Sequence, residues 1–255
     1  MTDHAVEIAK WDALAQADVS DRELMVAHRD FVAFTLQDST MTGIADFLGD
    51  LRGREVLELG SGMGEMTTQL ARSGARVTAI DISPGSIAMA RRRAELHGVA
   101  DAIEFVATAA EQLPLESDRF DVVVGKAVLH HLDAKRAAPE LHRVLRSGGR
   151  AAFAEPLGTN PVIAFARDHL PYPGKNPRGA DVPLSYADIR AWEAPFAVAD
   201  HREVQLLESV ERAFGLSPRP RLRRADDLLL GRFLVLRRLC RYVVIKMVKQ
   251  RPNRV

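Results

Sequence analysis

The chain has 255 residues, of which 47% are hydrophobic and 27% charged, and its formal net charge is +1 at pH 7. This composition is typical of a protein with a buried core, and it excludes a disordered or fibrous chain. The lone Cys240 excludes an internal disulfide, the sequence has no metal-ligand cysteine spacing, and no apolar run reaches the roughly 18 residues of a membrane span. We therefore expect a soluble, cytoplasmic protein with no metal site.

Basic residues concentrate near the end of the chain. Residues 217–255 contain twelve lysines and arginines but two aspartates, a net charge of +10 that leaves −9 for the remainder. Such a segment is either a solvated face that offsets the acidic body or a contact for an anionic partner or membrane surface.

The first half of the chain predicts an α/β core behind a helical segment. Apolar residues at helical spacing indicate an N-terminal helical cap over residues 1–53. Short β-branched runs then predict strands at 55–59, 76–80, 103–107, 120–125 and 150–154, with helices between them at 64–73, 84–97 and 134–145. Strands that alternate with such helices are typical of βαβ units, so residues 54–156 predict a core built on a parallel sheet.

The regular alternation ends after this core. Residues 156–183 contain six prolines and three glycines, which favours a loop over the carboxyl edge of the sheet with one short helix at 162–169. We expect residues 157–195 to form a lid or acceptor-binding insert. Residues 196–255 would complete the core with strands at 199–206 and 242–248, and with a basic amphipathic helix over 226–240 that Asp226 or Asp227 caps.

The most informative segment is residues 56–64, where a hydrophobic strand runs into three glycines at alternate positions. Glycines allow a tight turn and let a ligand approach the main chain and a helix N-terminus. A dinucleotide fingerprint requires glycine where this chain has Glu65, and Glu58 adds a second acid that disfavours a pyrophosphate. Asp81 follows about 20 residues later, where a carboxylate can bind a pair of ribose hydroxyls. The expected ligand has a ribose and little negative charge.

Four motifs in this order resemble the class I S-adenosylmethionine-dependent methyltransferases, in particular the small methyltransferase domain common in bacteria. They are residues 58–64, 77–83, 120–132 and 141–150. The resemblance runs from about residue 54 to 155. It implies a Rossmann-like seven-stranded sheet that is mostly parallel, with an antiparallel last strand and helices on both faces. It also implies S-adenosyl-L-methionine as the cofactor, with S-adenosyl-L-homocysteine as the product.

The resemblance implies a set of cofactor-binding residues that follow four successive strands: Glu58, Gly60, Ser61, Gly62, Gly64, Asp81, Ile82, Ala109, Ala110, Glu111, Lys126 and Ala127. Among them, Asp81 is implied to bind the ribose and Ile82 to contact the adenine. Many relatives have an aspartate in place of Ala109, so Glu111 or a backbone group would have to meet the adenine amine. Lys126 would stand beside a cationic sulfonium, and we expect its ammonium to point away.

Methyl transfer is an in-line displacement at a sulfonium, so an enzyme mainly aligns the reactants and excludes water. A base is needed only if the acceptor arrives protonated. His130 and His131 lie beyond the carboxyl end of the expected fourth strand and could remove a hydroxyl proton, with His130 the first candidate. Glu155, which ends the fifth strand, could contact the acceptor. Alternatively, the histidines cap or pack a helix and loop amides satisfy Glu155.

These features predict a methyltransferase that acts on a small or medium organic acceptor, at an oxygen atom. Apolar residues in the expected lid favour an acceptor with hydrophobic surface, while aromatic rings could line the pocket or belong to the core: Trp11, Phe31, Phe34 and Trp192. One alternative is a lipid-like acceptor, reached by peripheral membrane contact of the basic C-terminal segment. Another is a protein that binds the cofactor without turnover.

Two absences narrow the choice of acceptor. The chain has no Asn/Asp-Pro-Pro-Tyr/Phe motif after the fourth expected strand, the signature of amide or exocyclic amino acceptors. Few aromatic residues stand among the basic ones near the C-terminus, which disfavours a nucleic acid. The sequence does not predict an oligomeric state.

Overall fold

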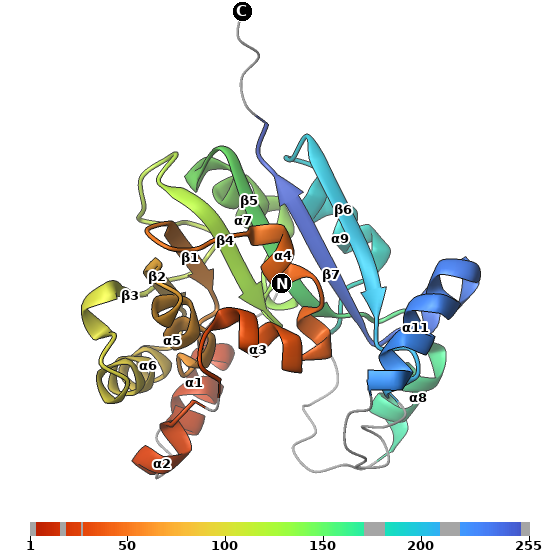
Figure 1. Cartoon of the computed structure of the whole chain (residues 1–255), viewed down its shortest axis with the longest axis horizontal. Coiled ribbons are helices and arrows are strands. Elements are labelled where there is room, and N and C mark those ends of the chain that lie inside the picture. Colours follow the sequence, from red (N-terminus) through yellow and green to blue (C-terminus); the bar gives the residue numbers. More distant parts are fainter. Residues whose placement is uncertain (1–3, 16–18, 27, 171–181, 210–219, 251–255) are drawn as a thin grey trace, which may run out of the picture.

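A computed structural model describes residues 4–15, 19–26, 28–170, 182–209 and 220–250. One seven-stranded sheet runs through the molecule, with helices on both of its faces (Figure 1). The strands are β1 (Glu55–Leu59), β2 (Arg76–Asp81), β3 (Ile103–Ala107), β4 (Phe120–Lys126), β5 (Leu145–Pro156), β6 (Val198–Val204) and β7 (Tyr242–Val248).

The strand order is β3-β2-β1-β4-β5-β7-β6. Strands β1 to β5 pair in parallel, whereas β7 runs antiparallel to both β5 and β6. The last strand in the chain is thus inserted between its two neighbours and is the reversed one. This confirms the predicted Rossmann-like sheet with its antiparallel last strand.

The strand predictions differ from the structure mainly in length. Strands β1, β3 and β7 have the predicted limits, while β5 covers twelve residues, Leu145–Pro156, instead of the five expected. The added residues that are paired have a partner on one edge: Leu145 pairs with Phe120 of β4, and Glu155 and Pro156 pair with Val243 and Tyr242 of β7. Pairing with a neighbouring strand thus extends β5 beyond its apolar run.

The α-helices are α1 (His4–Ala15), α2 (Asp21–Leu24), α3 (Phe31–Gln37), α4 (Ile44–Leu48), α5 (Glu65–Arg72), α6 (Pro84–Leu96), α7 (Ala134–Val144), α8 (Pro161–His169), α9 (Tyr186–Glu193) and α11 (Pro220–Arg232). The predicted start of α6 is confirmed, since Ser83 accepts a hydrogen bond from the Ser86 N–H and Pro84 follows it. In the part of the chain that the structure describes, no helix is both long and apolar enough to cross a bilayer.

The basic helix predicted over residues 226–240 differs from the structure. Helix α11 begins six residues earlier and ends at Arg232, and a 3₁₀ segment, η4 (Leu234–Leu239), follows it. The cap assignment was wrong, because Asp226 lies inside α11 and its buried carboxylate accepts the N–H groups of Leu206 and Leu207 at 2.9 and 2.8 Å. Its backbone partners belong to the chain that follows β6, which local sequence does not reveal.

Each face of the sheet carries its own hydrophobic cluster. Trp192 and Ile189 of α9 are fully buried in one cluster with α7, so part of the expected lid belongs to the core. Phe31 and Phe34 of α3 pack into the other cluster. Of the aromatic rings considered for the pocket, Trp11 alone lines the cavity described below. The rest of the expected lid consists mainly of α8 and of residues 171–181. Of these two segments, residues 171–181 lie outside the described residues.

Candidate functional site

A cavity of about 270 Å³ opens at the carboxyl ends of β1, β2 and β4, beneath α1. This edge is where open α/β sheets bind their ligands. Its wall consists of Leu59, Gly60, Gly62, residues 80–82, 108–110 and 126–128, His131 and Leu132, and α1 contributes His4, Glu7 and Trp11. Eight of the twelve predicted cofactor-binding residues thus share one cavity, while Glu58, Ser61, Gly64 and Glu111 lie outside its lining.

The three glycines after β1 do different things. A Cβ on Gly60, where φ is +67°, would stand 2.5 Å from Cγ2 of Val128. Gly62, with φ of +50°, has open space where its Cβ would be, and it faces the cavity. A Cβ on Gly64 would lie 2.7 Å from that of Ala90 in α6, so this glycine allows α5 and α6 to pack closely.

Asp81 fixes the glycine loop and also lines the cavity. Its Oδ2 accepts the Gly62 N–H at 2.8 Å, and its Oδ1 accepts the Ser83 N–H at 2.9 Å. Burial raises the pKa of Asp81, and the N–H groups of Ser83, Gly62 and Ile82 oppose that rise without cancelling it. Each carboxylate oxygen has a further lone pair, so the group can also accept hydrogen bonds from a vicinal diol.

Glu58 is buried beneath the loop and does not line the cavity. Burial raises its pKa to about 8; the nearby Thr67 hydroxyl opposes this rise, and the neighbouring charge of Asp81 adds to it. Its Oε2 has no hydrogen-bond partner within the described structure. The side chain is therefore mostly protonated at neutral pH and adds no full negative charge to the site.

Helix α1 forms the roof of the cavity. Asp12 Oδ1 accepts hydrogen bonds from Ser83 Oγ at 2.5 Å and from the Gly85 N–H at 2.9 Å, which fastens α1 to the start of α6. On the inner face of α1, Trp11 Nε1 donates to Glu7 Oε2 at 2.9 Å. Sequence reasoning missed this role for His4 and Glu7. Their spacing with Trp11 at i, i+3 and i+7 places them on one helix face and was the available signal.

The two adjacent histidines face different surroundings. His131 lines the cavity, and its Nδ1 lies 3.6 Å from Glu7 Oε1. His130, the first candidate from sequence, is buried instead, with Nδ1 2.8 Å from Glu155 Oε2. Glu155 is also fully buried, and its Oε1 accepts the N–H groups of Val128 and Leu129 at 2.8 and 2.9 Å. The geometry therefore favours His131 as the residue that meets a ligand, and gives His130 and Glu155 a supporting position behind it.

The segment after β4 carries two further features. Lys126 Nζ pairs with Asp38, which precedes the 3₁₀ turn η1 (Ser39–Met41). Burial acts to raise the pKa of Asp38, but the charge and hydrogen bond of Lys126 outweigh it and the pKa falls below its ordinary value. Ala127 has φ of +53°, a strained conformation for a residue with a Cβ, and its N–H donates to Ala154 O at 2.8 Å. Backbone strain thus occurs directly in the cavity wall.

The expected substitute for an aspartate at position 109 does not reach the cavity. Glu111 Oε1 lies 3.4 Å from His4 Nε2 and accepts the Asp133 N–H at 3.3 Å. Thr108, Ala109 and Ala110 line the wall on that side instead. Any polar contact to an adenine amine there would come from the Thr108 hydroxyl or from the backbone.

Comparison with known proteins agrees with this geometry. Residues 57–153 match the protein family described as "Methyltransferase domain". The matched segment resembles a class I methyltransferase domain. It extends from β1 into β5, and it therefore contains the glycine loop, Asp81 and both histidines.

Two relatives illustrate the match. Ubiquinone/menaquinone biosynthesis C-methyltransferase UbiE from Hahella chejuensis is 32% identical over 167 residues, which are 63% of this chain and 61% of that protein. Ubiquinone biosynthesis O-methyltransferase from Methylocella silvestris is 36% identical over 152 residues, 59% of each. The chain thus spans about six-tenths of the length of either relative.

The crystal structure of the [4+2]-cyclase SpnF has the same fold over nearly the whole chain. It superimposes with a TM-score of 0.67 at 19% identity, covering 99% of this chain and 98% of that one. At this identity the likeness concerns the fold alone, and a fold hosts more than one chemistry. Helix α1 lies outside the residues that match the family model. The roof of the cavity is therefore a feature of this chain rather than of the family match.

Proposed function

We propose that this protein transfers the methyl group of S-adenosyl-L-methionine to a small or medium organic acceptor held beneath α1. The observation that carries the proposal is the cavity at the carboxyl ends of β1, β2 and β4, where the open backbone of Gly62 and the carboxylate of Asp81 stand together. A glycine-lined wall beside a carboxylate suits a ligand with a ribose and little negative charge.

The residues of the cavity fit this cofactor. Asp81 would take the ribose hydroxyls, and Ile82 and Ala109 offer apolar surface to the adenine. Lys126 is the one lysine or arginine among the described lining residues, and its ammonium pairs with Asp38. A cationic sulfonium would therefore not meet an unpaired positive charge in the wall. Glu58 lies behind the glycine loop with an unpartnered oxygen, which suits a water molecule between this oxygen and the ammonium of the methionine portion.

When bound, the cofactor supplies a methyl group that is already activated by its sulfonium. The work of this chain is alignment of the acceptor and exclusion of water. Helix α1 covers the cavity, and Trp11, Val128 and Leu132 give it apolar walls. An acceptor with hydrophobic surface would displace water from these walls with a gain in free energy.

Methylation at oxygen is the finer part of the proposal, and His131 is its base. If the acceptor arrives as a hydroxyl, one imidazole nitrogen of His131 would take the proton that the oxygen loses on methylation. Glu7 would orient the ring and stabilise the imidazolium, since its carboxylate lies 3.6 Å from Nδ1. The two relatives are named as a C- and an O-methyltransferase, so their names favour neither acceptor atom.

A lipid-like acceptor is the second candidate. Exposed apolar side chains on α8 and η4 lie at the edge of the sheet that carries the cavity. Both relatives are named for ubiquinone biosynthesis. Under this alternative the chemistry is unchanged and the acceptor reaches the cavity from a membrane.

Calorimetric titration with S-adenosyl-L-methionine and S-adenosyl-L-homocysteine tests cofactor binding. We expect micromolar binding by the wild type and a loss of at least tenfold in Asp81→Ala, because the ribose contact and the support of Gly62 both disappear. Asp81→Asn keeps one acceptor for the loop and separates the two effects, and Asp101→Ala on the exposed 3₁₀ turn before β3 is the matched control. Unchanged affinity in Asp81→Ala would refute the assignment.

Turnover needs its own measurement. We would supply methyl-labelled cofactor with hydroxylated aromatic and lipid acceptors and follow the label into product. Labelled product from any of them supports the enzyme. Tight binding without transfer to any acceptor would instead favour a protein that holds the cofactor without turnover.

A further inference from the structure

Helix α11 presents an unusual outer face. Arg221, Arg224, Leu228 and Arg232 recur at i, i+3, i+7 and i+11, which puts them on one stripe of the helix. All four side chains are exposed, and Leu228 has an exposed fraction of 75%. The stripe combines positive charge with an apolar residue, and it points away from the sheet.

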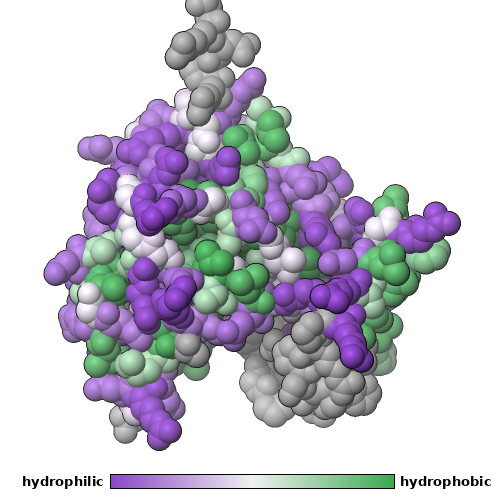
Figure 2. Space-filling view, viewed as in Figure 1, coloured by the Kyte–Doolittle hydropathy of each residue, from purple (hydrophilic) through white to green (hydrophobic). Residues whose placement is uncertain are grey.

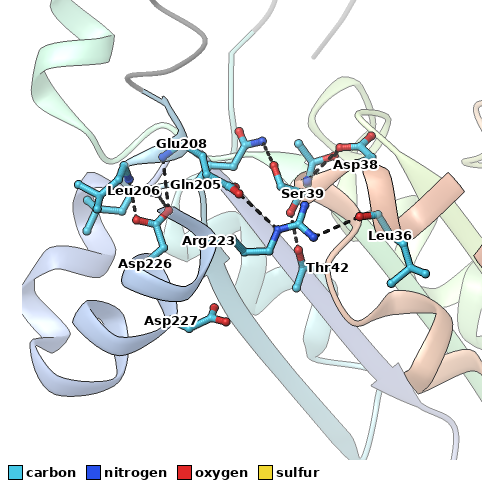
Figure 3. A network of polar contacts seen from close by, with 12 residues as sticks. Leu36, Asp38, Ser39, Thr42, Gln205, Leu206, Glu208, Arg223, Asp226 and Asp227 are labelled. Atoms are coloured by element: carbon cyan, nitrogen blue, oxygen red, sulfur yellow. Dashed lines mark hydrogen bonds and ion pairs between the residues drawn. The ribbon is translucent and has the colours of Figure 1, made fainter. Parts of the chain in front are cut away.

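The opposite face of α11 is fastened to the body of the protein (Figure 3). Arg223 donates to Leu36 O at 3.2 Å and to Glu208 Oε1 at 3.3 Å, so it bridges α11 to α3. The buried carboxylate of Asp226 holds the N–H groups of Leu206 and Leu207. These contacts fix the rotation of the helix, and the arginine stripe therefore keeps its outward orientation.

An apolar tip follows the helix directly. Phe233, Leu234 and Val235 are consecutive, and their exposed fractions are 51%, 64% and 74%. Helix α8 lies below α11 in the lower right of Figure 1 and exposes Val162 and Phe165. Figure 2 shows hydrophobic surface in that region, bordered by hydrophilic side chains. Exposed apolar surface that is contiguous and rimmed by charge marks an interaction site.

Hydrogen bonds join α8 to η4. Asn160, the N-cap of α8, donates from Nδ2 to Leu239 O at 2.6 Å, and Thr159 Oγ1 donates to Arg238 O at 2.9 Å. Segment η4 thus links α8 to α11, and we call the outer face of α11, the tip 233–235 and the exposed side chains of α8 together the docking corner.

The docking corner is positively charged. Within the described residues, Arg221, Arg224, Arg232 and Arg238 take part in no ion pair, whereas the nearby Asp227 is paired with Arg202 at 2.7 Å. Arginines around an exposed apolar tip complement an anionic phospholipid surface: the guanidinium groups meet phosphates, and the apolar side chains enter the boundary with the acyl chains.

We propose that the docking corner binds the surface of a bilayer that contains anionic phospholipids. Other occupants fit the charges less well. A symmetric dimer through this surface would place unpaired arginines of one copy against those of the other. A nucleic acid would satisfy the arginines but would leave the tip 233–235 in water.

Docking would turn the cavity edge of the sheet toward the membrane. Segment η4 leads into β7, whose first residue, Tyr242, pairs with Pro156 at the carboxyl end of β5. The carboxyl ends of the parallel strands β1, β2 and β4, which form the cavity, lie at the same edge. Membrane binding is independent of methyl transfer, and either can hold without the other.

Co-sedimentation with vesicles tests the proposal, using the full chain without cofactor. We expect binding to vesicles of 70% phosphatidylcholine and 30% phosphatidylglycerol, and at least tenfold weaker binding to pure phosphatidylcholine. The triple variant Phe233→Ser, Leu234→Ser, Val235→Ser should bind at least tenfold more weakly. Arg221→Gln, Arg224→Gln, Arg232→Gln together should do the same and remove most of the salt dependence between 50 and 300 mM.

Matched controls replace exposed residues elsewhere: Val198→Ser with Leu96→Ser for the apolar set, and Arg22→Gln with Arg136→Gln for the charged set. These should bind as the wild type does. Thermal unfolding of every variant separates lost binding from lost fold, since all the replaced side chains are exposed.

Three results would overturn the proposal. One is that the protein does not bind the anionic vesicles. Another is that the protein binds neutral and anionic vesicles equally well, and that the arginine variant binds them as the wild type does. The third is evidence for another occupant. Either self-association in analytical ultracentrifugation or duplex DNA binding tighter than vesicle binding would be such evidence, if the tip variant abolishes it.

Discussion

The floor and the roof of the cavity are built in different ways. The floor consists of strand ends and the glycine loop, which the Gly62 N–H joins to the Asp81 carboxylate and the Ser61 N–H joins to Ile80 O of β2. The roof is a single helix, α1, held to α6 by Asp12 and to the cavity by side chains such as Glu7. The floor should therefore tolerate little change, whereas the roof can be loosened without loss of the fold.

Replacing His131 should give the largest effect among the variants that test how the cavity is built. With a working acceptor, His131→Ala should lower kcat about 10²–10³-fold at neutral pH, because a positioned base contributes roughly that much. The melting temperature should change little, since the side chain lies at the cavity rather than in the core. A kcat–pH profile would check the role: the acidic limb should disappear in the variant. Full activity in His131→Ala would remove the base from the mechanism.

His130→Ala should act on stability instead. It leaves the fully buried carboxylate of Glu155 without its imidazole partner, and breaking a buried pair costs about 3 kcal/mol. Denaturant unfolding measures this loss. Glu155→Gln together with His130→Ala should recover part of it, because the uncompensated charge is gone. A stable but inactive His130→Ala would restore His130 as the catalytic candidate.

Two glycines with positive φ allow a test of how little change the floor of the cavity tolerates. Gly60→Ala combines backbone strain with a contact at 2.5 Å to Val128, whereas Gly53→Ala has similar φ and nothing within 4 Å. We expect a cost of about 1 kcal/mol in Gly53→Ala and about 2 kcal/mol or more in Gly60→Ala. Cofactor affinity should fall only in Gly60→Ala. Equal effects of both on affinity would mean that the close approach to Val128 is unimportant.

The roof should respond more mildly. Asp12→Ala removes the two hydrogen bonds that fasten α1 to α6, and we expect KM for the acceptor to rise about fivefold, equivalent to about 1 kcal/mol. Global stability should stay nearly constant, which thermal unfolding can check. Asp21→Ala, which removes a surface pair with Arg92, is the control. If Asp12→Ala unfolds the protein, α1 is part of the core rather than a roof.

Glu58 should make the stability of the protein change gradually with pH, which is the smallest effect that we expect. Its pKa in the folded protein, raised to about 8 by burial, exceeds the ordinary value of 4.5, so the folded state holds the proton more tightly than the unfolded state does. The stabilisation that this group gives is therefore fully present below pH 4.5 and is lost as pH rises through 8. The slope is at most about 1.4 kcal/mol per pH unit. Denaturant curves at pH 5 to 8 should show the wild type losing stability relative to Glu58→Gln; parallel curves would contradict the pKa.

Much of the floor could be predicted from the sequence because its signals are local. A hydrophobic run that ends in alternate glycines specifies both a strand and the turn after it, and Asp81 ends the next strand. Four motifs in order carried the resemblance that implied the sheet and its class. The burial of α9 had no comparable signal, because Ile189 and Trp192 meet α7 and the sheet across long stretches of chain.

Tertiary structure decided which side chains reach the cavity. His130 and His131 are neighbours on one 3₁₀ turn, η3 (Leu129–His131), and successive residues of such a turn point about 120° apart. Glu155, from β5, contacts His130, and His131 is the one that lines the cavity. By itself the sequence determined the fold, the glycine loop and the carboxylate at its edge. The choice of histidine, the roof of α1 and the outward stripe of α11 depend on partners distant in the chain, which periodicity and spacing do not encode.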